Sequence, residues 1–450
     1  MSDDCIRVLS LNCWGLKYVS KNRAQRIQAI AHSLSTSSYD IVCLQEVWVR
    51  DDFEHIRVAV SSRLLYDKIF HRRVFPDGVT GAGLAIFSRY PIIAASLLPY
   101  SLNGHPLDFK GADWFAGKAA ASVLVTHPIL GEVQVFNTHF FSEGGDDGPE
   151  HNRAHRLVNA WEFAKLVRQV AEVGRHVIAA GDFNSAPSTL PMIVIREHAG
   201  LEDAWGTLHP PAQPAYSNDN SPNPVEALSL HGFTYDSPLN SYSAHVQAPA
   251  SAPLAKRLDY IFIRNPRPSA LSLPRLTPTD ARVVFTEPIP GREFSYSDHF
   301  GVEATFAINR ADIKDDMLFP ALDPDRTHVT TIPASTMPTS ASTPCLSHEH
   351  TMTVIHALET HLTHSKARAR REMCVVAMCS FLLVAVLVGT GWSPRGFLTP
   401  VFVFLGIGAT YIGTTLFHVG FLYHRWEANA LRNAIDEMML YAQGLGSRQV

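Results

Sequence analysis

The sequence has little cysteine, no surplus of basic residues and no leader pattern at its start. Six cysteines are spread over 450 residues without any paired metal-binding spacing: Cys5, Cys13, Cys43, Cys345, Cys374 and Cys379. We therefore expect free thiols facing a reducing compartment, not a disulfide framework. The first residues lack a basic stretch followed by an apolar one, so we expect no secretory signal peptide.

Charged residues are also few, and neither sign dominates. Asp, Glu, Lys and Arg make up 18% of the chain, the formal net charge is -4, and the pI is about 6.6. Proteins that bind nucleic acid usually carry a basic face, so this composition argues against a nucleic-acid partner. The length allows about two or three domains.

Two long stretches near the end of the chain contain no Asp, Glu, Lys or Arg at all: 373–392 and 397–423. Each is long enough to cross the hydrocarbon core of a bilayer, which is about 30 Å thick. The alternative is a pair of buried helices in a soluble protein, but such helices rarely run so far without a charge. We therefore predict a transmembrane helical hairpin.

Basic residues set the predicted orientation of this hairpin. The connecting loop holds only Arg395, whereas the outer ends are flanked by Lys366, Arg368, Arg370, Arg371, Arg425 and Arg432. Because cytoplasmic flanks are enriched in Lys and Arg, we expect both outer ends, and the large domain before them, on the cytosolic side. The expected membrane is the endoplasmic reticulum, with the mitochondrial outer membrane as the alternative.

Before these stretches, predicted strands and helices alternate along the chain. Short apolar runs predict strands at 6–13, 39–47, 81–89, 119–126, 133–140, 176–180, 256–263 and 301–307. Apolar residues at helical spacing predict helices at 21–35, 51–65 and 151–173. Such alternation is typical of a layered α/β domain.

Composition divides the chain into consecutive parts. They are 1–310 for the α/β domain, 311–348 for a Ser/Thr/Pro-rich linker, 349–372 for a polar, partly amphipathic juxtamembrane helix, 373–392 and 397–423 for the transmembrane helices, and 424–450 for a cytosolic tail. Within the first part, 209–255 is rich in Pro, Ser and Asn. We expect it to form a long excursion close to the functional site.

The most informative polar cluster follows the predicted strand 176–180. The sequence continues as Gly181-Asp182-Phe183-Asn184, in which glycine permits a tight turn that aims Asp182 and Asn184 at one spot. Oxygen ligands at a rigid strand end suit a hard cation, a phosphate or both. The same residues can also form an ordinary Asx turn, so the cluster gains weight from similar residues at other strand ends.

Three further residues are candidate metal ligands. Glu46 ends a buried strand, Asn12 ends the strand expected beside it, and Asp298 precedes the last strand. Mg²⁺ typically binds one or two carboxylates and keeps waters for a substrate phosphate. We therefore assign Glu46, Asn12 and Asp298 to a Mg²⁺ site, in which Asn12 could also orient Glu46. The alternative for each is a solvated residue at a strand end or turn.

Two histidines are candidate acid–base groups. His299 can take a proton from water if its other ring nitrogen is held, and Asp259 is expected to hold it. No Ser or Cys stands in an activating motif, so we expect water to be the nucleophile. His139 is the candidate acid for a leaving alkoxide, while Asp182 and Asn184 would position water and phosphate. The alternatives are a capped turn at His299 and a half-buried strand residue at His139.

Lys118 is a further candidate, together with Asn184, for contact with a substrate phosphate. It follows Gly117, which would let the backbone approach a phosphate, and it supplies a positive charge. The surrounding sequence lacks the Walker pattern, so we do not expect a nucleoside-triphosphate loop. Asp113 could pair with Lys118, and an exposed position on the rim is the alternative.

The motifs occur in a fixed order along 5–308: Asn12, Gln45-Glu46, Asn137-Thr138-His139, Gly181 to Asn184, Arg257 to Tyr260 and Ser297-Asp298-His299. In this order they resemble the endonuclease/exonuclease/phosphatase superfamily. The resemblance implies a four-layer sandwich, in which two mixed β-sheets pack face to face with helices outside. It also implies a metal, usually Mg²⁺, between the sheet ends.

Four stretches identify a branch of that superfamily: 9–16, 45–48, 104–118 and 137–140. They resemble neutral sphingomyelinases, in particular the membrane-anchored kind that includes fungal inositol phosphosphingolipid phospholipases C, which also carry paired C-terminal spans. The resemblance implies Mg²⁺-dependent hydrolysis of a sphingolipid in a bilayer to ceramide and a phosphorylated head group. It also implies activation by anionic phospholipid. Whether the head group is phosphocholine or phosphoinositol stays open.

Three other functions remain as alternatives. A nuclease of the same superfamily would need a basic duplex-binding surface. A membrane-tethered inositol polyphosphate phosphatase would carry a Trp-Cys-Asp-Arg stretch where this chain has 256–259. A catalytically inactive membrane scaffold for lipid binding would not need the acid, base and metal residues that the sequence contains.

Overall fold

The computed structural model describes residues 4–70, 81–108, 113–142, 150–209, 224–243, 255–266, 273–310, 345–392 and 396–446. The α/β part contains two six-stranded sheets. The first has the order β11 (Arg275–Val284), β12 (Gly301–Asn309), β1 (Cys5–Asn12), β2 (Ile41–Gln45), β4 (Leu84–Ser88) and β3 (Tyr66–Phe70). The second has the order β5 (Ile92–Pro99), β6 (Ala119–His127), β7 (Gly131–His139), β8 (His176–Asp182), β10 (Asp259–Arg264) and β9 (Glu202–Asp203).

Both sheets are mixed, and each has one parallel pair at its centre. β1 and β2 are parallel, as are β7 and β8, whereas the other paired strands are antiparallel. The carboxyl ends of parallel neighbours lie at the same edge of a sheet. Asn12 therefore lies opposite Gln45 in the first sheet, and His139 lies opposite Asp182 in the second.

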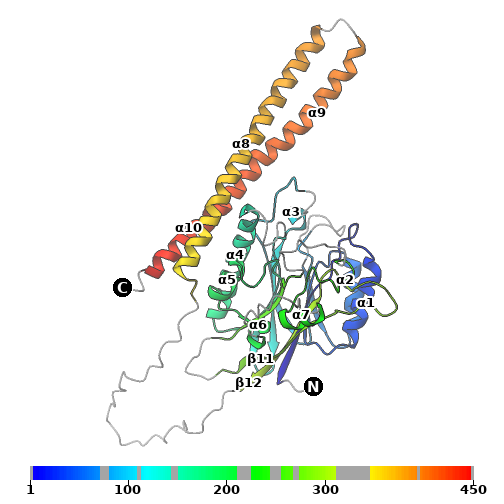
Figure 1. Cartoon of the computed structure of the whole chain (residues 1–450), viewed down its shortest axis with the longest axis vertical. Helices are drawn as coiled ribbons and strands as arrows, with labels where there is room; N and C mark the ends of the chain where they lie inside the picture. Colours follow the sequence, from blue (N-terminus) through cyan, green and yellow to red (C-terminus); the bar gives the residue numbers. More distant parts are fainter. Residues whose placement is uncertain are drawn as a thin grey trace, which may run out of the picture.

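An apolar layer joins the inner faces of the two sheets, and helices cover the outer faces (Figure 1). Ile86 and Phe306 of the first sheet share one buried cluster with Val135 of the second. α1 (Arg23–Thr36) and α2 (Arg50–Val60) pack on the first sheet, and α4 (Glu150–Glu172) and α5 (Leu190–Glu197) pack on the second. Each fully buried Leu, Ile or Phe contributes about 1.5–3 kcal/mol. The predicted four-layer sandwich is confirmed.

The structure confirms the predicted strands and helices of the α/β domain to within a few residues and adds others. β5 was not predicted although its sequence is apolar; it is an edge strand whose side chains are mostly exposed, and a short apolar run by itself does not distinguish a strand from a helix. Four short helices were also not predicted, namely α3 (Asp113–Ala116), α5, α6 (Ala204–Leu208) and α7 (Pro224–His231). Strands β3, β9 and β11 were not predicted either. Parts of the predicted excursion 209–255 and most of the predicted linker 311–348 lie outside the described residues.

The C-terminal part consists of long helices that project from the α/β domain (Figure 1). α8 (His348–Trp392) is 45 residues long, and α9 (Thr399–Phe417) continues through a π-helical segment (His418–Tyr423) into α10 (His424–Gly446). Both helical runs are long and apolar enough to cross a membrane. Of the residues in the apolar stretch of each run, only 0% and 6% are buried. Two helices buried in a soluble core would not show this exposure, so the helices are a candidate membrane hairpin.

The parts of these helices that lie outside the two apolar stretches dock on the α/β domain. We call residues 348–372 of α8 together with α10 the stem. Apolar side chains of the stem belong to the same buried cluster as those of α4 and α5: Val354, Ile355, Ala357, Leu358, Leu362, Ala428, Leu431, Ala434, Ile435 and Met438. No pattern in the sequence predicted this contact between distant segments. The stem therefore extends the core that lies on the outer face of the second sheet.

Candidate active site

Polar residues from both sheets meet where the strands end. In the second sheet, His139, Asp182 and Asp259 occupy neighbouring register positions on β7, β8 and β10. In the first sheet, Asn12 lies opposite Gln45 on β1 and β2. Strand register therefore brings together residues that are far apart in the sequence.

These strand ends border one pocket of about 380 Å³. Its lining includes predicted site residues, namely Glu46, His139, Asp182, Asn184, Asp298 and His299. The rest of the lining is Trp14, Leu16, Ser142, Tyr235, Lys256 and Leu258. The remaining predicted residues, Asn12, Asp259 and Lys118, are buried behind this lining.

His299 and Asp259 form the pair that the sequence predicts. His299 Nδ1 lies 2.9 Å from Asp259 Oδ2, and both side chains are buried. A proton on Nδ1 donates to the carboxylate, and in the neutral ring this leaves Nε2 as the acceptor. Nε2 lies 3.8 Å from Asp182 Oδ2. The pair can therefore hold a neutral imidazole with its basic nitrogen toward Asp182 and the pocket.

The pKa values of the two histidines in the pocket are shifted in opposite directions. Burial lowers the pKa of His299, but the carboxylates of Asp259 and Asp182 outweigh it and hold that pKa well above its usual value. Burial, followed by the Lys118 ammonium, holds the pKa of His139 well below its usual value. Positive charge placed beside Asp182 would lower the pKa of His299. The protonation state of His299 therefore depends on charge in the pocket.

Glu46 fits a hard cation. It adopts a left-handed backbone conformation (φ 58°), which is strained for a residue with a side chain and is common at functional sites. Its Oε1 accepts a 3.3 Å hydrogen bond from Asn12 Nδ2, while its buried Oε2 has no hydrogen-bond partner among the described residues. A buried carboxylate oxygen without a donor is costly unless it is paired. Glu46 can therefore offer an oxygen to a divalent cation.

Asn12 orients carboxylates in this structure. Its Nδ2 also donates to Asp182 Oδ2 over 3.0 Å, and its Oδ1 accepts from the backbone N–H of Trp14 over 3.0 Å. One of the two lone pairs of the amide oxygen that a cation would require is thus already in use. This contact pattern favours the orienting role over direct metal ligation for Asn12.

Asp298 adds a second carboxylate to the pocket. Its Oδ1 accepts from Ser297 Oγ over 3.2 Å, and burial raises its pKa to about 6. Asp182, Asp259 and His299 also lie close enough to one another to hold a metal ion. Asp259 and His299 of this group are already hydrogen-bonded to each other, so Glu46 and Asp298 are the more available metal ligands.

Lys118 differs from both sequence expectations, the exposed rim and direct contact with the pocket. Its ammonium is buried, 2.7 Å from His139 Nε2 and 3.1 Å from Asp113 Oδ1. Asp113 in turn accepts from the backbone N–H and the hydroxyl of Ser142 over 2.8 and 2.7 Å. The predicted pairing with Asp113 is present, and Lys118 acts on the pocket from behind His139.

The Gly181–Asn184 turn satisfies both interpretations of its sequence. Asp182 Oδ1 accepts from the backbone N–H of Asn184 over 2.9 Å, which is the Asx turn, while both side chains line the pocket. A Cβ at Gly181 would lie 2.1 Å from Thr138 O, so only glycine fits there. The Asx turn therefore positions the side chains of Asp182 and Asn184 in the pocket.

Several pocket residues were not predicted. The Tyr235 ring packs against the His299 ring with 4.6 Å between centroids, and Thr234 Oγ1 accepts from the backbone N–H groups of Leu258 and Asp259. Tyr235 belongs to the excursion 209–255, which carries no motif. Lys256 could have been found, because it stands three residues before Asp259.

The stability of the protein should depend on pH through Asp182. Burial and the nearby Asp259 raise the pKa of Asp182 to about 7. The folded state then binds this proton more tightly than the unfolded state, so the stability it contributes is lost as the pH rises from about 4 to about 7. We expect Asp182→Asn to gain Tm relative to wild type by several degrees over this window, since each pKa unit is worth about 1.4 kcal/mol. Thermal melts in detergent with chelator would measure it.

The exposed Asp280→Asn substitution is the control for that series. A Tm difference between Asp182→Asn and wild type that stays constant from acid to neutral pH would contradict the assignment.

Most of the chain is similar in sequence to known proteins. The sequence profile described as the Endonuclease/Exonuclease/phosphatase family matches residues 9–299. The chain is 33% identical over 435 residues to Inositol phosphosphingolipids phospholipase C of Schizosaccharomyces pombe, covering 96% of this chain and 93% of that protein. It is 30% identical over 460 residues to the Saccharomyces cerevisiae protein of the same name, covering 96% and 89%.

A third relative matches a shorter region. Sphingomyelin phosphodiesterase 2 of Homo sapiens is 34% identical over 206 residues, which cover 44% of this chain and 46% of that protein. The similarity to the two yeast proteins therefore extends through the C-terminal helices, whereas the match to the human protein covers less than half of either chain.

Proposed function

The chain belongs to the Endonuclease/Exonuclease/phosphatase family, and from that premise we propose that it is a Mg²⁺-dependent phosphodiesterase of the phospholipase C type. Its substrate is a sphingolipid, either an inositol phosphosphingolipid or sphingomyelin, and its products are ceramide and a phosphorylated head group. The observation that carries this proposal is the His299–Asp259 pair in the same pocket as the unpaired oxygen of Glu46. The full-length similarity to the two yeast phospholipases supports it.

In the proposed mechanism, a water attacks the phosphodiester phosphorus. His299 Nε2 takes the proton from this water while Asp259 holds Nδ1, and such general base help contributes about 10²–10⁴-fold. Mg²⁺, held by Glu46 with Asp298 beside it, would neutralise charge on the phosphoryl oxygens. Asp182 and Asn184 position the water and the phosphate.

The leaving group is the ceramide oxygen, and His139 is the proposed acid: its low pKa makes the charged ring a strong proton donor, and the Lys118 ammonium beside Nε2 can supply the proton. Its ring lies 3.4 Å from Asp182 and 2.7 Å from the Lys118 ammonium. Lys118 directs positive charge toward the phosphate from behind the ring. The proposed acid and the proposed base both approach the same oxygen of Asp182, Oδ2, through their Nε2 atoms.

The membrane hairpin fits this chemistry because the scissile bond of a sphingolipid lies at a bilayer surface. We propose that the hairpin anchors the chain with the α/β domain in the cytosol, in the endoplasmic reticulum. Anionic phospholipid is the proposed activator. Tethering removes the need for a separate adsorption step before each turnover.

The test compares two lipids under two metal conditions. Full-length protein in detergent receives sphingomyelin or inositol phosphoceramide in mixed micelles, with Mg²⁺ or with chelator and with anionic phospholipid present. We expect ceramide and a water-soluble phosphate only with Mg²⁺, and the ratio of the two rates gives the head-group preference. No ceramide from either lipid would overturn the proposed function.

A further inference from the structure

A buried carboxylate joins the stem to the α/β domain. Glu427 of α10 is 0% exposed, and its Oε1 lies 3.3 Å from His155 Nε2 of α4 and 3.2 Å from His361 Nε2 of α8. Its Oε2 accepts from Arg368 Nη2 over 2.6 Å and from the hydroxyl of Ser365. A buried charge is tolerated only when it is paired and hydrogen-bonded. Glu427 therefore needs the docked arrangement to be satisfied.

The donors on Glu427 come from two helices. His361, Ser365 and Arg368 belong to α8, which is part of the stem itself. His155 is the donor from the α/β domain. The hydrogen bonds from His155 and His361, followed by the charge of Arg368, outweigh burial and hold the pKa of Glu427 far below its usual value. The contact with His155 thus ties an ionised group of the stem to the domain.

The same three groups, His155, His361 and Glu427, lie close enough to hold a metal ion, but the proton on His155 argues against it. His155 Nδ1 accepts the backbone N–H of Gly104 over 2.8 Å, so the neutral ring carries its proton on Nε2. That nitrogen can donate to Glu427 but has no lone pair for a metal. The cluster is therefore a hydrogen-bonded hub.

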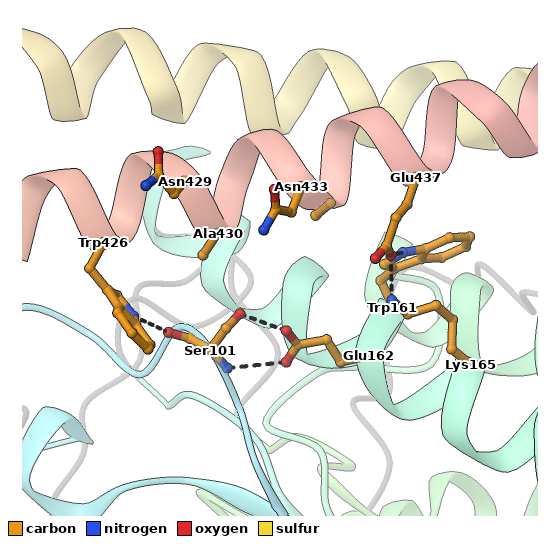
Figure 2. Close-up of a pocket in the computed structure, with 10 residues that line it drawn as sticks. Ser101, Trp161, Glu162, Lys165, Trp426, Asn429, Ala430, Asn433 and Glu437 are labelled. Carbon is orange, nitrogen blue, oxygen red and sulfur yellow. Dashed lines mark hydrogen bonds and ion pairs between the residues drawn. The ribbon is translucent and has the colours of Figure 1, made fainter.

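His155 is one of several residues of α4 and the C-terminal helices that hold the segment Ser101–Gly104. The hydroxyl of Tyr423, the last residue of the π-helical segment before α10, donates to Gly104 O, and Trp426 Nε1 of α10 donates to Ser101 O over 2.9 Å. Figure 2 shows Trp426 reaching Ser101, whose N–H and hydroxyl are bonded to Glu162 of α4. The segment is thus clamped between α4 and α10.

The clamped segment in turn packs against the end of β7 beside the pocket. A Cβ on Gly104 would lie 2.9 Å from Phe141 Cε2, and the Phe141 ring lies 5.0 Å from the His155 ring. Asn159 of α4 accepts from the N–H of Phe141 over 3.0 Å and donates to Leu102 O over 2.9 Å. Phe141 is followed by Ser142, which lines the pocket, and preceded two positions earlier by His139.

We propose that Glu427 and His155 are positioning residues for the active site. The docked stem holds Ser101–Gly104, and this segment holds Phe141–Ser142 at the pocket wall beside His139. The hairpin is thus part of the catalytic device as well as its anchor. The statement that it acts on turnover rests on the proposed function, whereas the mechanical coupling does not.

The first test replaces Glu427 with glutamine in the full-length protein in detergent. We expect amide hydrogen exchange at 101–104 and 140–142 to become about tenfold faster, while exchange in β8 and β10 stays unchanged. With short-chain, water-soluble sphingolipid analogues we expect kcat to fall about tenfold with little change in KM, because positioning acts on the transition state. Unchanged exchange at 101–104 and 140–142 would overturn the coupling.

Matched variants separate the hub from general packing. Glu437→Gln on the same helix removes the negative charge that contacts Trp161 and Lys165, and it should leave exchange at 140–142 unaltered. His155→Gln can still accept from Gly104 and donate to Glu427, so its amide exchange and kcat should stay close to the wild-type values. His155→Leu can do neither, so it should behave like Glu427→Gln. Equal loss in both His155 variants, or one equivalent of metal lost on Glu427→Gln, would overturn the hydrogen-bonded hub.

A milder variant covers the case in which Glu427→Gln does not fold. Trp426→Phe removes only the hydrogen bond to Ser101 O and leaves an exposed aromatic side chain. It should speed exchange at 101–104 in the same direction by a smaller factor, and no change there would count against the clamp. Absence of turnover in wild type would refute the proposed function, while the exchange data would still decide the coupling.

Discussion

Replacing His299 with alanine lowers turnover by about 10²–10⁴-fold, the range expected for losing a general base. The imidazole is the only group in the proposed mechanism that takes the proton from water, and Asp259 holds it by a 2.9 Å hydrogen bond. Alanine cannot replace the proton acceptor, whereas the pocket keeps its shape for lipid. The measurement is the rate of ceramide release at saturating Mg²⁺, together with binding of the intact lipid.

Two companions make this result specific. His55→Ala alters an exposed histidine on α2 and should leave turnover unchanged. Asp259→Asn should lower turnover and shift the pH profile, because the amide no longer fixes the tautomer of His299. Turnover of His299→Ala within tenfold of wild type would assign the base to another residue.

Replacing Glu46 with glutamine should lower turnover by about 10³-fold, since charge neutralisation by a metal is worth several kcal/mol. The substitution keeps the size of the side chain but removes the negative charge and the unpaired Oε2. We expect Mg²⁺ to raise the Tm of wild type and to have little effect on the Tm of Glu46→Gln. Calorimetric titration with Mg²⁺ would measure the loss of affinity directly.

The control for Glu46 is Glu132→Gln, which alters an exposed carboxylate paired with Arg175. It should leave both Mg²⁺ affinity and turnover unchanged. If Glu46→Gln bound Mg²⁺ as tightly as wild type, the metal would have to lie on Asp298 or on the group formed by Asp182, Asp259 and His299.

The sequence by itself determined the features that depend on local pattern. Apolar periodicity placed the strands that end at Asn12, Glu46 and Asp182, and the side-chain types at those ends indicated a phosphate and cation site. Two stretches without a charge predicted the hairpin, because the length and polarity of a membrane span are properties of a continuous segment. The edge strand β5 was not predicted although its sequence is apolar, because a short apolar run does not by itself distinguish a strand from a helix.

Only the tertiary structure decided the contacts between distant segments. His155 and Glu427 are 272 positions apart, and no local pattern reveals that they meet. The same holds for Lys118 behind His139 and for the Asn12 oxygen that is used by Trp14. Hydrogen-bond partners depend on strand register and helix docking, which arise when the whole chain packs. The identities of the site residues are thus local information, but their roles depend on which groups the fold places beside them.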